Sequence, residues 1–226
     1  MPKKSLSTGL ARRERSRLSQ TVFSQLSHAI IGGEFEPGAR VSEPTLSAML
    51  GVSRAPIREA LIELQLRGLV DFDPTGHTRI PVLTPRDIEE IYVVRLMIDP
   101  VAAGLAAERG TQQDFAVLEK NIQAMKKAKT LADVSRLDAE FHDRIVRAAG
   151  NRRLLLCWNS LRDQFALWLT QMQLRHEAVT HRTRQATVES HDHLLDAIRS
   201  GDVKQAAEVA RRHVAGWIKV MPRLEN

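Results

Sequence analysis

Hydrophobic residues change their spacing roughly a third of the way along the chain. Up to residue 85, short apolar stripes are interrupted by closely spaced glycines and prolines. From residue 86 onward such breakers are sparse, and apolar positions recur with the period of an α-helix. We therefore expect a mainly α protein with a domain boundary close to Leu83–Asp87.

The first part of the chain predicts three helices followed by a hairpin. Ser42 is placed to cap the second helix and Ser53 the third, because serine side chains accept hydrogen bonds from free amides at helix starts. Two short extended runs follow, joined by a turn at residues 73–77. This order is typical of a winged helix-turn-helix, which we place at residues 19–82.

The second part, residues 83–226, predicts an all-helical domain. Its expected helices are 85–108, 111–128, 131–149, 151–175, 179–200 and 202–221. Cys157 is the lone cysteine and lies in an apolar run, so we expect it to be a buried core residue. No apolar stretch is long enough to span a bilayer, and the N-terminus has no signal-peptide pattern, so we expect a cytoplasmic protein.

The charge distribution points only weakly to nucleic acid. The net charge of +6 and a pI near 9.9 favour an acidic partner. However, residues 1–17 carry six basic side chains and one acid, whereas residues 18–82 carry five basic side chains and seven acids. The surplus therefore lies in a predicted basic tail, residues 1–18, which is either solvated or an arm along a phosphate backbone.

The predicted third helix opens with two arginines that suit a DNA reader. Arg54 and Arg58 are four residues apart, so both project from one side of its first turns. Arginine pairs bidentately with guanine or clamps a phosphate. From the spacing alone, two solvated surface arginines are the more common interpretation.

A longer motif surrounds these arginines. It consists of Pro37-Gly38-Ala39-Arg40-Val41-Ser42-Glu43, Leu46-Ser47, Leu50-Gly51-Val52-Ser53-Arg54-Ala55-Pro56-Ile57-Arg58-Glu59-Ala60-Leu61 and Gly68-Leu69-Val70. Residues 19–82 thereby resemble the DNA-binding domain of GntR-type bacterial regulators. The resemblance implies principal DNA contacts from Arg54 and Arg58, with Ser53 and Ala55 beside them, and a wing tip at Gly76-His77 in the minor groove. Pro44 stands where some relatives carry a contacting arginine, so that contact should be missing or replaced.

Histidines and an aspartate fall on or beside the apolar stripes of three predicted helices. These residues are Asp138, His142, His191 and His213. The stripe that His213 interrupts is expected to run Val203, Ala206, Ala210, His213, Trp217 and Met221. A buried ionisable group must be hydrogen-bonded, paired or metal-bound. One Asp and three His suit a divalent ion, but four separately satisfied core residues remain an equal alternative at this point.

The second half resembles the FadR-like branch of the same family, whose FCD effector domain is an antiparallel helical bundle. The motifs are Val94-Arg95 with Asp99, Asp138-x-x-Phe141-His142, Gly150-Asn151, Glu189-x-His191, Gly201-Asp202 and Ala210-x-x-His213, over residues 84–221. The resemblance implies a divalent metal, Zn²⁺ first and Ni²⁺ or Mn²⁺ as alternatives, held by Asp138, His142, His191 and His213. It also implies a small carboxylate effector that meets Arg95. Asp99 stands where many relatives have Glu.

These observations lead to one hypothesis and two rivals. The hypothesis is a homodimeric repressor that binds a pseudo-palindromic operator in double-stranded DNA and responds to a small organic acid. The first rival is a helical-bundle metalloenzyme that uses the Asp/His set, but the sequence contains no nucleophile elbow or P-loop to support it. The second rival is a helical adaptor in which the arginines have no DNA to contact.

Overall fold

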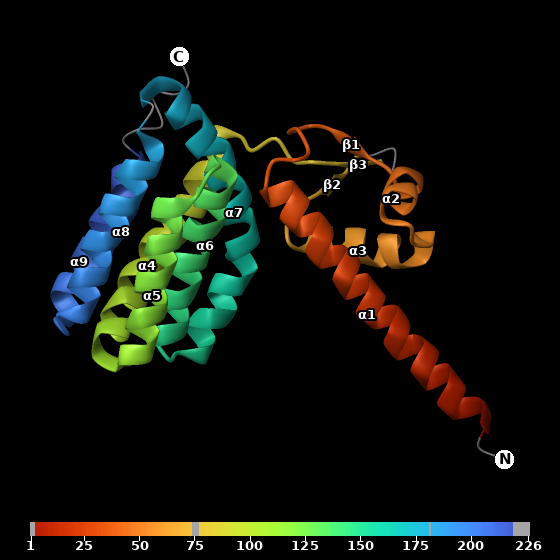
Figure 1. The fold of residues 1–226 in the computed structure, drawn as a ribbon, viewed down its shortest axis with the longest axis horizontal. Coiled ribbons are helices and arrows are strands. Elements are labelled where there is room, and N and C mark those ends of the chain that lie inside the picture. The colour runs from red at the N-terminus through yellow and green to blue at the C-terminus, as the bar shows by residue number, and fades with distance from the viewer. Residues whose placement is uncertain (1–2, 74–76, 181, 219–226) are drawn as a thin grey trace. The chain divides into compact units, whose positions relative to one another are not determined.

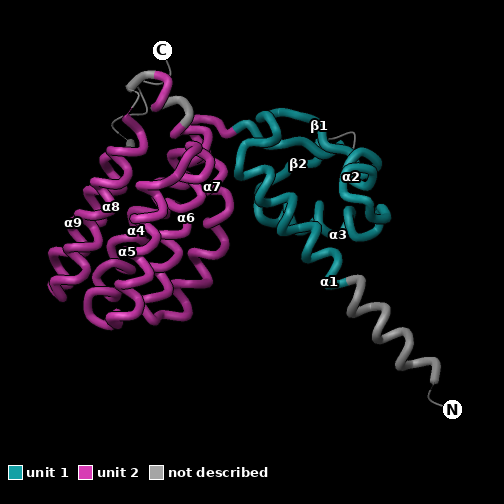
Figure 2. The backbone as a smooth tube through the Cα atoms, in the orientation of Figure 1, with its two compact units in different colours: residues 1–82 teal, residues 83–226 magenta. Residues whose placement is uncertain are grey.

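The computed structural model describes the backbone of residues 3–73, 77–180 and 182–218. The chain divides into two compact units, residues 1–82 and 83–226 (Figure 2). The described residues form nine helices and three short strands, so the expected mainly α fold is confirmed (Figure 1). None of these helices is long and apolar enough to cross a membrane.

Unit 1 is a three-helix domain with a small sheet. Its elements are α1 Lys3–Ile31, β1 Arg40–Val41, α2 Glu43–Leu50, α3 Arg54–Leu66, β2 Asp71–Phe72 and β3 Thr78–Arg79. Helix α1 begins at Lys3, so the backbone of the predicted basic tail continues the first helix. The helix can extend this far because the segment from Lys3 to Arg17 contains no proline and a single glycine, Gly9.

The sheet of unit 1 contains a strand that the sequence pattern did not predict. The expected hairpin is present as β2 and β3, and β1 adds to the free edge of β3 in the antiparallel order β1-β3-β2. Arg40 pairs with Arg79, and Val41 pairs with Thr78. A two-residue strand has no periodicity to detect, and its existence depends on a partner 37 or more positions away in the sequence.

The two cap predictions for α2 and α3 have different outcomes. The Ser42 hydroxyl accepts from the Thr45 amide, as expected of an N-cap. Ser53 occupies the N-cap position of α3, but its side chain makes no capping hydrogen bond. The cause is Pro56, because it stands at the third helical position and has no N–H to donate.

Helices α1 and α3 cross and enclose most of the core of unit 1 (Figure 1). The side chains that meet there are apolar and almost fully buried: Val22, Leu26, Ile30, Ile57, Leu61 and Leu64. Leu46 of α2 is buried with them. This packing fixes the start of α3, which carries the two arginines, on the surface of the unit.

Unit 2 is a helical bundle. Its elements are α4 Pro85–Arg109, α5 Gln112–Lys127, α6 Leu131–Ala148, α7 Arg152–Thr180, α8 Thr183–Arg199 and α9 Val203–Ile218. Helix α4 contacts α6, α7, α8 and α9, and α6 contacts α4, α5, α7 and α8 (Figure 1). Helices α4 and α6 therefore supply the inner faces on which polar side chains can converge.

The joint between α7 and α8 lies later than predicted. Helix α7 continues to Thr180 instead of residue 175, because residues 176–180 contain no glycine or proline. Helix α8 begins at Thr183 instead of residue 179, and the Thr183 amide donates to the Glu177 carboxylate at 2.9 Å. Both predicted helices exist, but their shared boundary was wrong by about one turn.

Two predicted core residues lie outside the core. Cys157 is exposed, because Trp158 takes the buried position of that apolar run and Cys157 projects from another side of α7. Val203, expected on the buried stripe of α9, is 44% exposed. The side chains of Trp217 and Met221, placed on the same stripe, lie outside the described residues.

Candidate functional site

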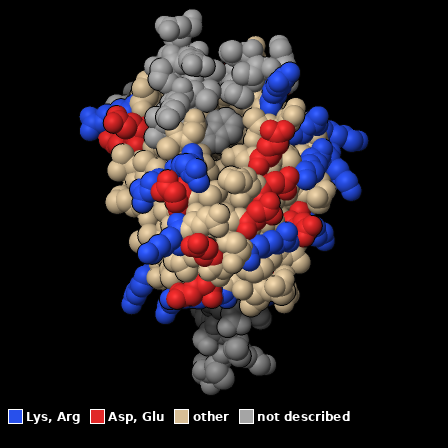
Figure 3. Space-filling view, turned by 90° about the vertical axis from the view of Figure 1, so that its left-hand side faces the viewer, with Lys and Arg blue, Asp and Glu red and all other residues tan. Residues whose placement is uncertain are grey.

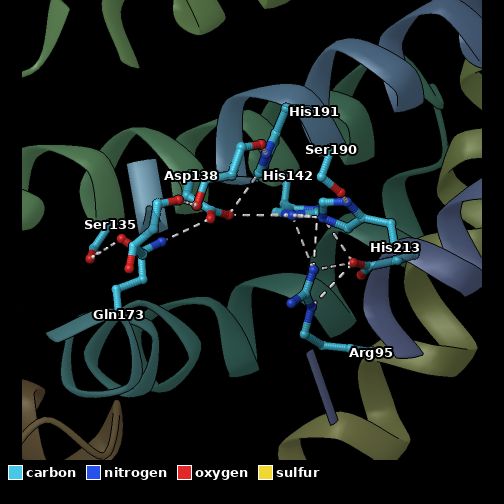
Figure 4. A network of polar contacts seen from close by, with 11 residues as sticks. Arg95, Ser135, Asp138, His142, Gln173, Ser190, His191 and His213 are labelled. Carbon is cyan, nitrogen blue, oxygen red and sulfur yellow. Dashed lines mark hydrogen bonds and ion pairs between the residues drawn. The ribbon is translucent and has the colours of Figure 1, made fainter. Parts of the chain in front are cut away.

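The four predicted metal ligands meet inside unit 2. Asp138 and His142 come from α6, His191 from α8 and His213 from α9, and all four are buried (Figure 4). His142 Nε2 lies 3.3 Å from His213 Nε2 and 3.4 Å from Asp138 Oδ1. His191 Nε2 lies 3.3 Å from the same Asp138 oxygen. Three helices thus point four donor atoms at one place.

His191 and His213 are each oriented by a hydrogen-bond partner outside the predicted ligand set. The Nδ1 atom of His191 lies 2.6 Å from the Thr187 carbonyl oxygen, to which only a protonated ring nitrogen can donate. The Nδ1 atom of His213 lies 2.7 Å from the Ser190 hydroxyl. In both residues the second ring nitrogen, Nε2, therefore faces the shared centre, as in metal-binding histidines.

His142 is oriented in the same way by a charged pair. Its Nδ1 atom lies 3.3 Å from Asp99 Oδ2, and its Nε2 atom faces Asp138 and His213. Arg95 contacts both, with Nε 3.1 Å from Asp99 Oδ2 and Nη2 3.1 Å from His142 Nε2. A carboxylate on the far side of a histidine ring fixes its tautomer and raises its basicity toward a metal.

Asp138 is held by a relay that the sequence analysis did not identify. Gln173 Nε2 donates to Asp138 Oδ2 at 3.1 Å, and Ser135 Oγ donates to Gln173 Oε1 at 3.0 Å (Figure 4). This leaves Asp138 Oδ1 turned toward the histidines. The missed signal was the position of Gln173, which follows buried Phe165 and Leu169 at helical spacing on α7.

Burial and neighbouring charges together lower the pKa of both Asp138 and His213. Burial alone would raise the pKa of Asp138, but the charge of His191 and hydrogen bonds from the histidines outweigh it and hold that pKa far below its usual value. Burial, followed by the charges of His191 and His142, lowers the pKa of His213. The acid is therefore ionised and His213 neutral, which are the forms that bind a metal.

The donor set fits a divalent ion. The three histidines offer nitrogens within 4.8 Å of one another, and His191 Nε2 is buried without a hydrogen bond. A tetrahedral ion with bonds of about 2.0–2.1 Å places its ligand atoms about 3.3 Å apart. The separations of His142 from His213 and of Asp138 from two histidines match that spacing.

Arg95, the predicted effector contact, is buried and already paired. Its Nε and Nη2 atoms both donate to Asp99 Oδ2, and its guanidinium stacks over Phe165 at 3.9 Å from the ring centroid. Burial would raise the pKa of Asp99, but Arg95 and His142 lower it to about 2. The Nε–Nη2 edge of the Arg95 guanidinium, which was expected to bind an effector carboxylate, is thus occupied by Asp99. Nη1 is the guanidinium nitrogen that makes no contact with Asp99.

The predicted DNA-contact residues lie at the start of α3 in unit 1. Arg54, Arg58 and Ser53 are exposed, and Ala55 is half-buried. Arg58 was not predicted to be paired, yet it donates to both carboxylate oxygens of Glu43 on α2 at 2.8 and 3.0 Å. This hydrogen bonding raises the pKa of Arg58 and lowers that of Glu43. The contact positions the guanidinium and neutralises part of its charge.

The predicted wing is described only in part. His77 lies beside Asp73, whose carboxylate accepts from the His77 amide at 3.0 Å. Gly76 lies outside the described residues. Pro44 occupies the first turn of α2, so no arginine contact comes from that position.

The surface charge of unit 2 gives no second nucleic-acid site on the side that Figure 3 shows. There, on the side of α8 and α9, lysines and arginines alternate with aspartates and glutamates (Figure 3). Arg199 with Glu119 and Lys126 with Asp192 are ion pairs between α5 and α8 of this unit. Mixed charge of this kind favours solubility more than phosphate binding.

Comparison with known families identifies both units. Residues 18–80 match the model of the bacterial regulatory proteins of the gntR family, and residues 90–216 match the FCD domain. The chain belongs to the GntR family and carries an FCD domain. This confirms the resemblance drawn from the motifs, and the helical second unit is the FCD domain of this GntR-family regulator.

Relatives of this GntR-family regulator are transcription regulators. The chain is 31% identical over 205 residues to the transcriptional repressor assigned to the D-xylose utilization operon of Paenarthrobacter nicotinovorans, with 88% of each chain covered. It is 34% identical over 136 residues to the regulator YdhC of Bacillus subtilis strain 168, covering 58% of this chain and 61% of that protein. The family model and these relatives are those of transcription regulators, so the metalloenzyme and adaptor rivals are not retained.

A solved structure shares the fold. E. coli McbR/YncC superposes with a TM-score of 0.78 at 23% identity, covering 92% of this chain and 99% of that one. The likeness supports the winged helix-turn-helix followed by a helical domain, as expected from the sequence.

Proposed function

We propose that this GntR-family regulator is a homodimeric repressor whose operator affinity is controlled by a small carboxylate bound beside a divalent metal in the FCD domain. The observation that carries the proposal is the convergence of Asp138, His142, His191 and His213, each tied by an outer partner so that one donor atom faces a common centre. Ordinary core packing does not require four such tethers around one point.

Asp138, His142, His191 and His213 would hold the ion, with Zn²⁺ the best match and Ni²⁺ or Mn²⁺ as alternatives. When bound, the ion supplies positive charge that attracts a carboxylate. Arg95 lies against the same centre, with Nη2 3.1 Å from His142 Nε2, and it offers a second cation to the acid. The role of Arg95 is to orient the carboxylate next to the metal ligands.

The DNA reader of the proposal is the start of α3. Arg54 and Arg58 are exposed on its first turns, and the amides of a helix N-terminus add attraction for phosphate. Glu43 prepositions Arg58 through two hydrogen bonds. The expected operator is a pseudo-palindrome, because two copies of the chain present two such helices.

An exposed apolar face on α4 supports the homodimer. Val93, Met97 and Val101 recur at helical spacing and are 51%, 60% and 51% exposed. Between Glu90 and Glu108 the only charged residues of α4 are the buried Arg95 and Asp99, so this face carries no charge over more than four turns. A face of this kind is typical of a protein interface.

The same face is self-complementary in charge. Arg86 and Glu108 lie eleven residues before and after Met97. Two α4 helices that cross antiparallel at Met97 therefore bring Arg86 of each copy near Glu108 of the other. An isologous dimer requires this kind of symmetry.

A pair of histidines on α8 tests the metal and its coupling to DNA. His191→Ala removes a ligand, whereas His193→Ala changes an exposed histidine two residues away. We expect His191→Ala to lose bound metal and the response of operator binding to the effector, while DNA binding itself is kept. A coupling of about 1–3 kcal/mol corresponds to a roughly 5- to 150-fold change in operator affinity.

Metal content by mass spectrometry and operator affinity at fixed salt are the measurements. His193→Ala should match the unmodified protein in both. Full metal retention in His191→Ala would contradict the ligand set.

A further inference from the structure

The charges buried around the proposed effector site are few and can be counted. Among the described residues, Arg95, Asp99 and Asp138 are the buried side chains that carry a fixed charge. They sum to one negative charge, and a divalent ion brings the total to one positive charge, since metal-bound histidines are neutral. In this count Asp138 is a metal ligand and Arg95 is the contact of the effector carboxylate. Asp99 is the remaining charged residue, and it lowers the net charge of the site by one.

A single net positive charge matches a single carboxylate. Burying a net charge in a low-dielectric core is costly, so the site should select the ligand that brings its charge closest to zero. A second carboxylate would leave one negative charge buried without a partner. Asp99 thus discriminates against dicarboxylates through its charge.

Asp99 also offers a hydrogen-bond acceptor that the protein does not use. Its Oδ2 atom accepts from Arg95 and lies near His142, whereas its Oδ1 atom is buried with no hydrogen-bond partner among the described residues. A buried carboxylate oxygen without a partner costs free energy that a ligand hydroxyl can recover. The two oxygens of one carboxylate therefore have different roles: Oδ2 positions Arg95, and Oδ1 remains for a donor.

We propose that the effector of this regulator is a hydroxylated monocarboxylate, with its carboxylate beside Arg95 and its hydroxyl donating to Asp99 Oδ1. This inference rests on the proposed sensor function and specifies its ligand class. Asp99 is then the specificity-determining residue, acting through charge against dicarboxylates and through Oδ1 in favour of the hydroxyl. Asp99 lies one turn after Arg95 on α4, so it lies close to the carboxylate that Arg95 contacts and can act on both the charge and the hydroxyl of the ligand.

The test is calorimetric titration of the full-length, zinc-loaded protein with three acids. Lactate has one carboxylate and a hydroxyl, 2-methoxypropionate keeps the oxygen but cannot donate, and malate adds a second carboxylate to the hydroxyl. The first pair tests the donated hydrogen bond, and the same pair measured on Asp99→Asn separates it from the added volume of the methyl group. We expect lactate to bind at least about tenfold more tightly than 2-methoxypropionate. We expect malate to bind at least about tenfold more weakly than lactate.

A variant assigns the discrimination to Asp99. In Asp99→Asn the preference for lactate over 2-methoxypropionate should fall to roughly twofold or less, and malate should gain relative to lactate, because the amide removes one negative charge. Glu89→Gln makes the same change of carboxylate to amide at an exposed position of α4 and should leave both preferences unchanged. Zinc content and thermal melting establish that each variant is folded.

The outcomes separate this inference from the function on which it rests. Malate binding as tightly as lactate, or equal binding of lactate and 2-methoxypropionate, overturns the ligand class even if Asp99→Asn does not fold. A preference for lactate that persists in folded Asp99→Asn overturns the role of Asp99. If the zinc-loaded protein binds none of these acids, the ligand class fails, whereas the metal site of the sensor function fails only if His191→Ala also retains its zinc.

Discussion

The side-chain amide of Gln173 donates to Asp138 Oδ2 at 3.1 Å and thereby turns the other carboxylate oxygen toward three histidines. Gln173 is fully buried, and Ser135 fixes which end of its amide faces Asp138. The pair connects α7 to α6 across the bundle. The Gln173–Asp138 hydrogen bond explains why only one carboxylate oxygen of Asp138 faces the histidines.

Gln173→Met is expected to weaken zinc binding about 10- to 100-fold, because the ligand carboxylate loses the partner that orients it. Methionine retains the length and volume of glutamine, so the bundle should remain folded. Competition with a chelator of known zinc affinity measures the effect. Gln113→Met, at an exposed position of α5, is the control. Unchanged zinc affinity in Gln173→Met would show that the relay has no role in metal binding.

Arg58→Ala should reduce specific operator affinity by about 1–3 kcal/mol, or roughly 5- to 150-fold, because one bidentate contact with a base is lost. The fold and zinc content should be unchanged, since Arg58 is exposed and its partner Glu43 remains partly in water. Fluorescence anisotropy with operator and scrambled duplexes at fixed salt measures the loss. Arg211→Ala, an exposed arginine of α9, should have no effect. Equal losses on both duplexes would reassign Arg58 to phosphate contact.

Met97→Asp is expected to convert the proposed dimer to a monomer, because it places a charge at the centre of an otherwise uncharged apolar face. Sedimentation velocity measures the change, and operator affinity should fall by about 100-fold or more as the second half-site contact is lost. Leu156→Asp adds the same charge at an exposed apolar position of α7 and should leave the dimer intact. A Met97→Asp dimer would place the interface elsewhere.

Asp114→Asn should lower stability by about 1 kcal/mol at pH 7, or about 2–4 °C in melting temperature. The Asp114 carboxylate accepts from the Thr111 hydroxyl and amide, and these hydrogen bonds lower its pKa. A lowered folded-state pKa adds stability above about pH 4, and this stability is lost as the pH falls through the folded value. The difference in stability between Asp114→Asn and the unmodified protein should therefore disappear in acid. A stability difference that does not change with pH would exclude the ionised Asp114 carboxylate as its cause. Asp196→Asn, at an exposed position of α8, is the control.

Local patterns predicted the helices and several site residues for an identifiable reason. Helical periodicity depends on neighbouring residues, so the inward positions of His142, His191 and His213 were visible in the sequence. The same periodicity placed Asp138 beside the stripe, and the family motifs added Arg95 as an effector contact. The sequence could not place the α7–α8 joint, because residues 176–180 favour helix and the end depends on Glu177 meeting the Thr183 amide.

The sequence by itself determined which residue types face the interior, since an apolar stripe and its polar interruptions follow from helical spacing alone. Only the tertiary structure decided how those residues pair. Arg95 reaches His142 on another helix, Arg58 pairs with Glu43 of α2, and Gln173 reaches Asp138 from α7. Pairing depends on distances of a few ångströms between separate elements, and these are set by packing of the whole domain, which no local pattern records.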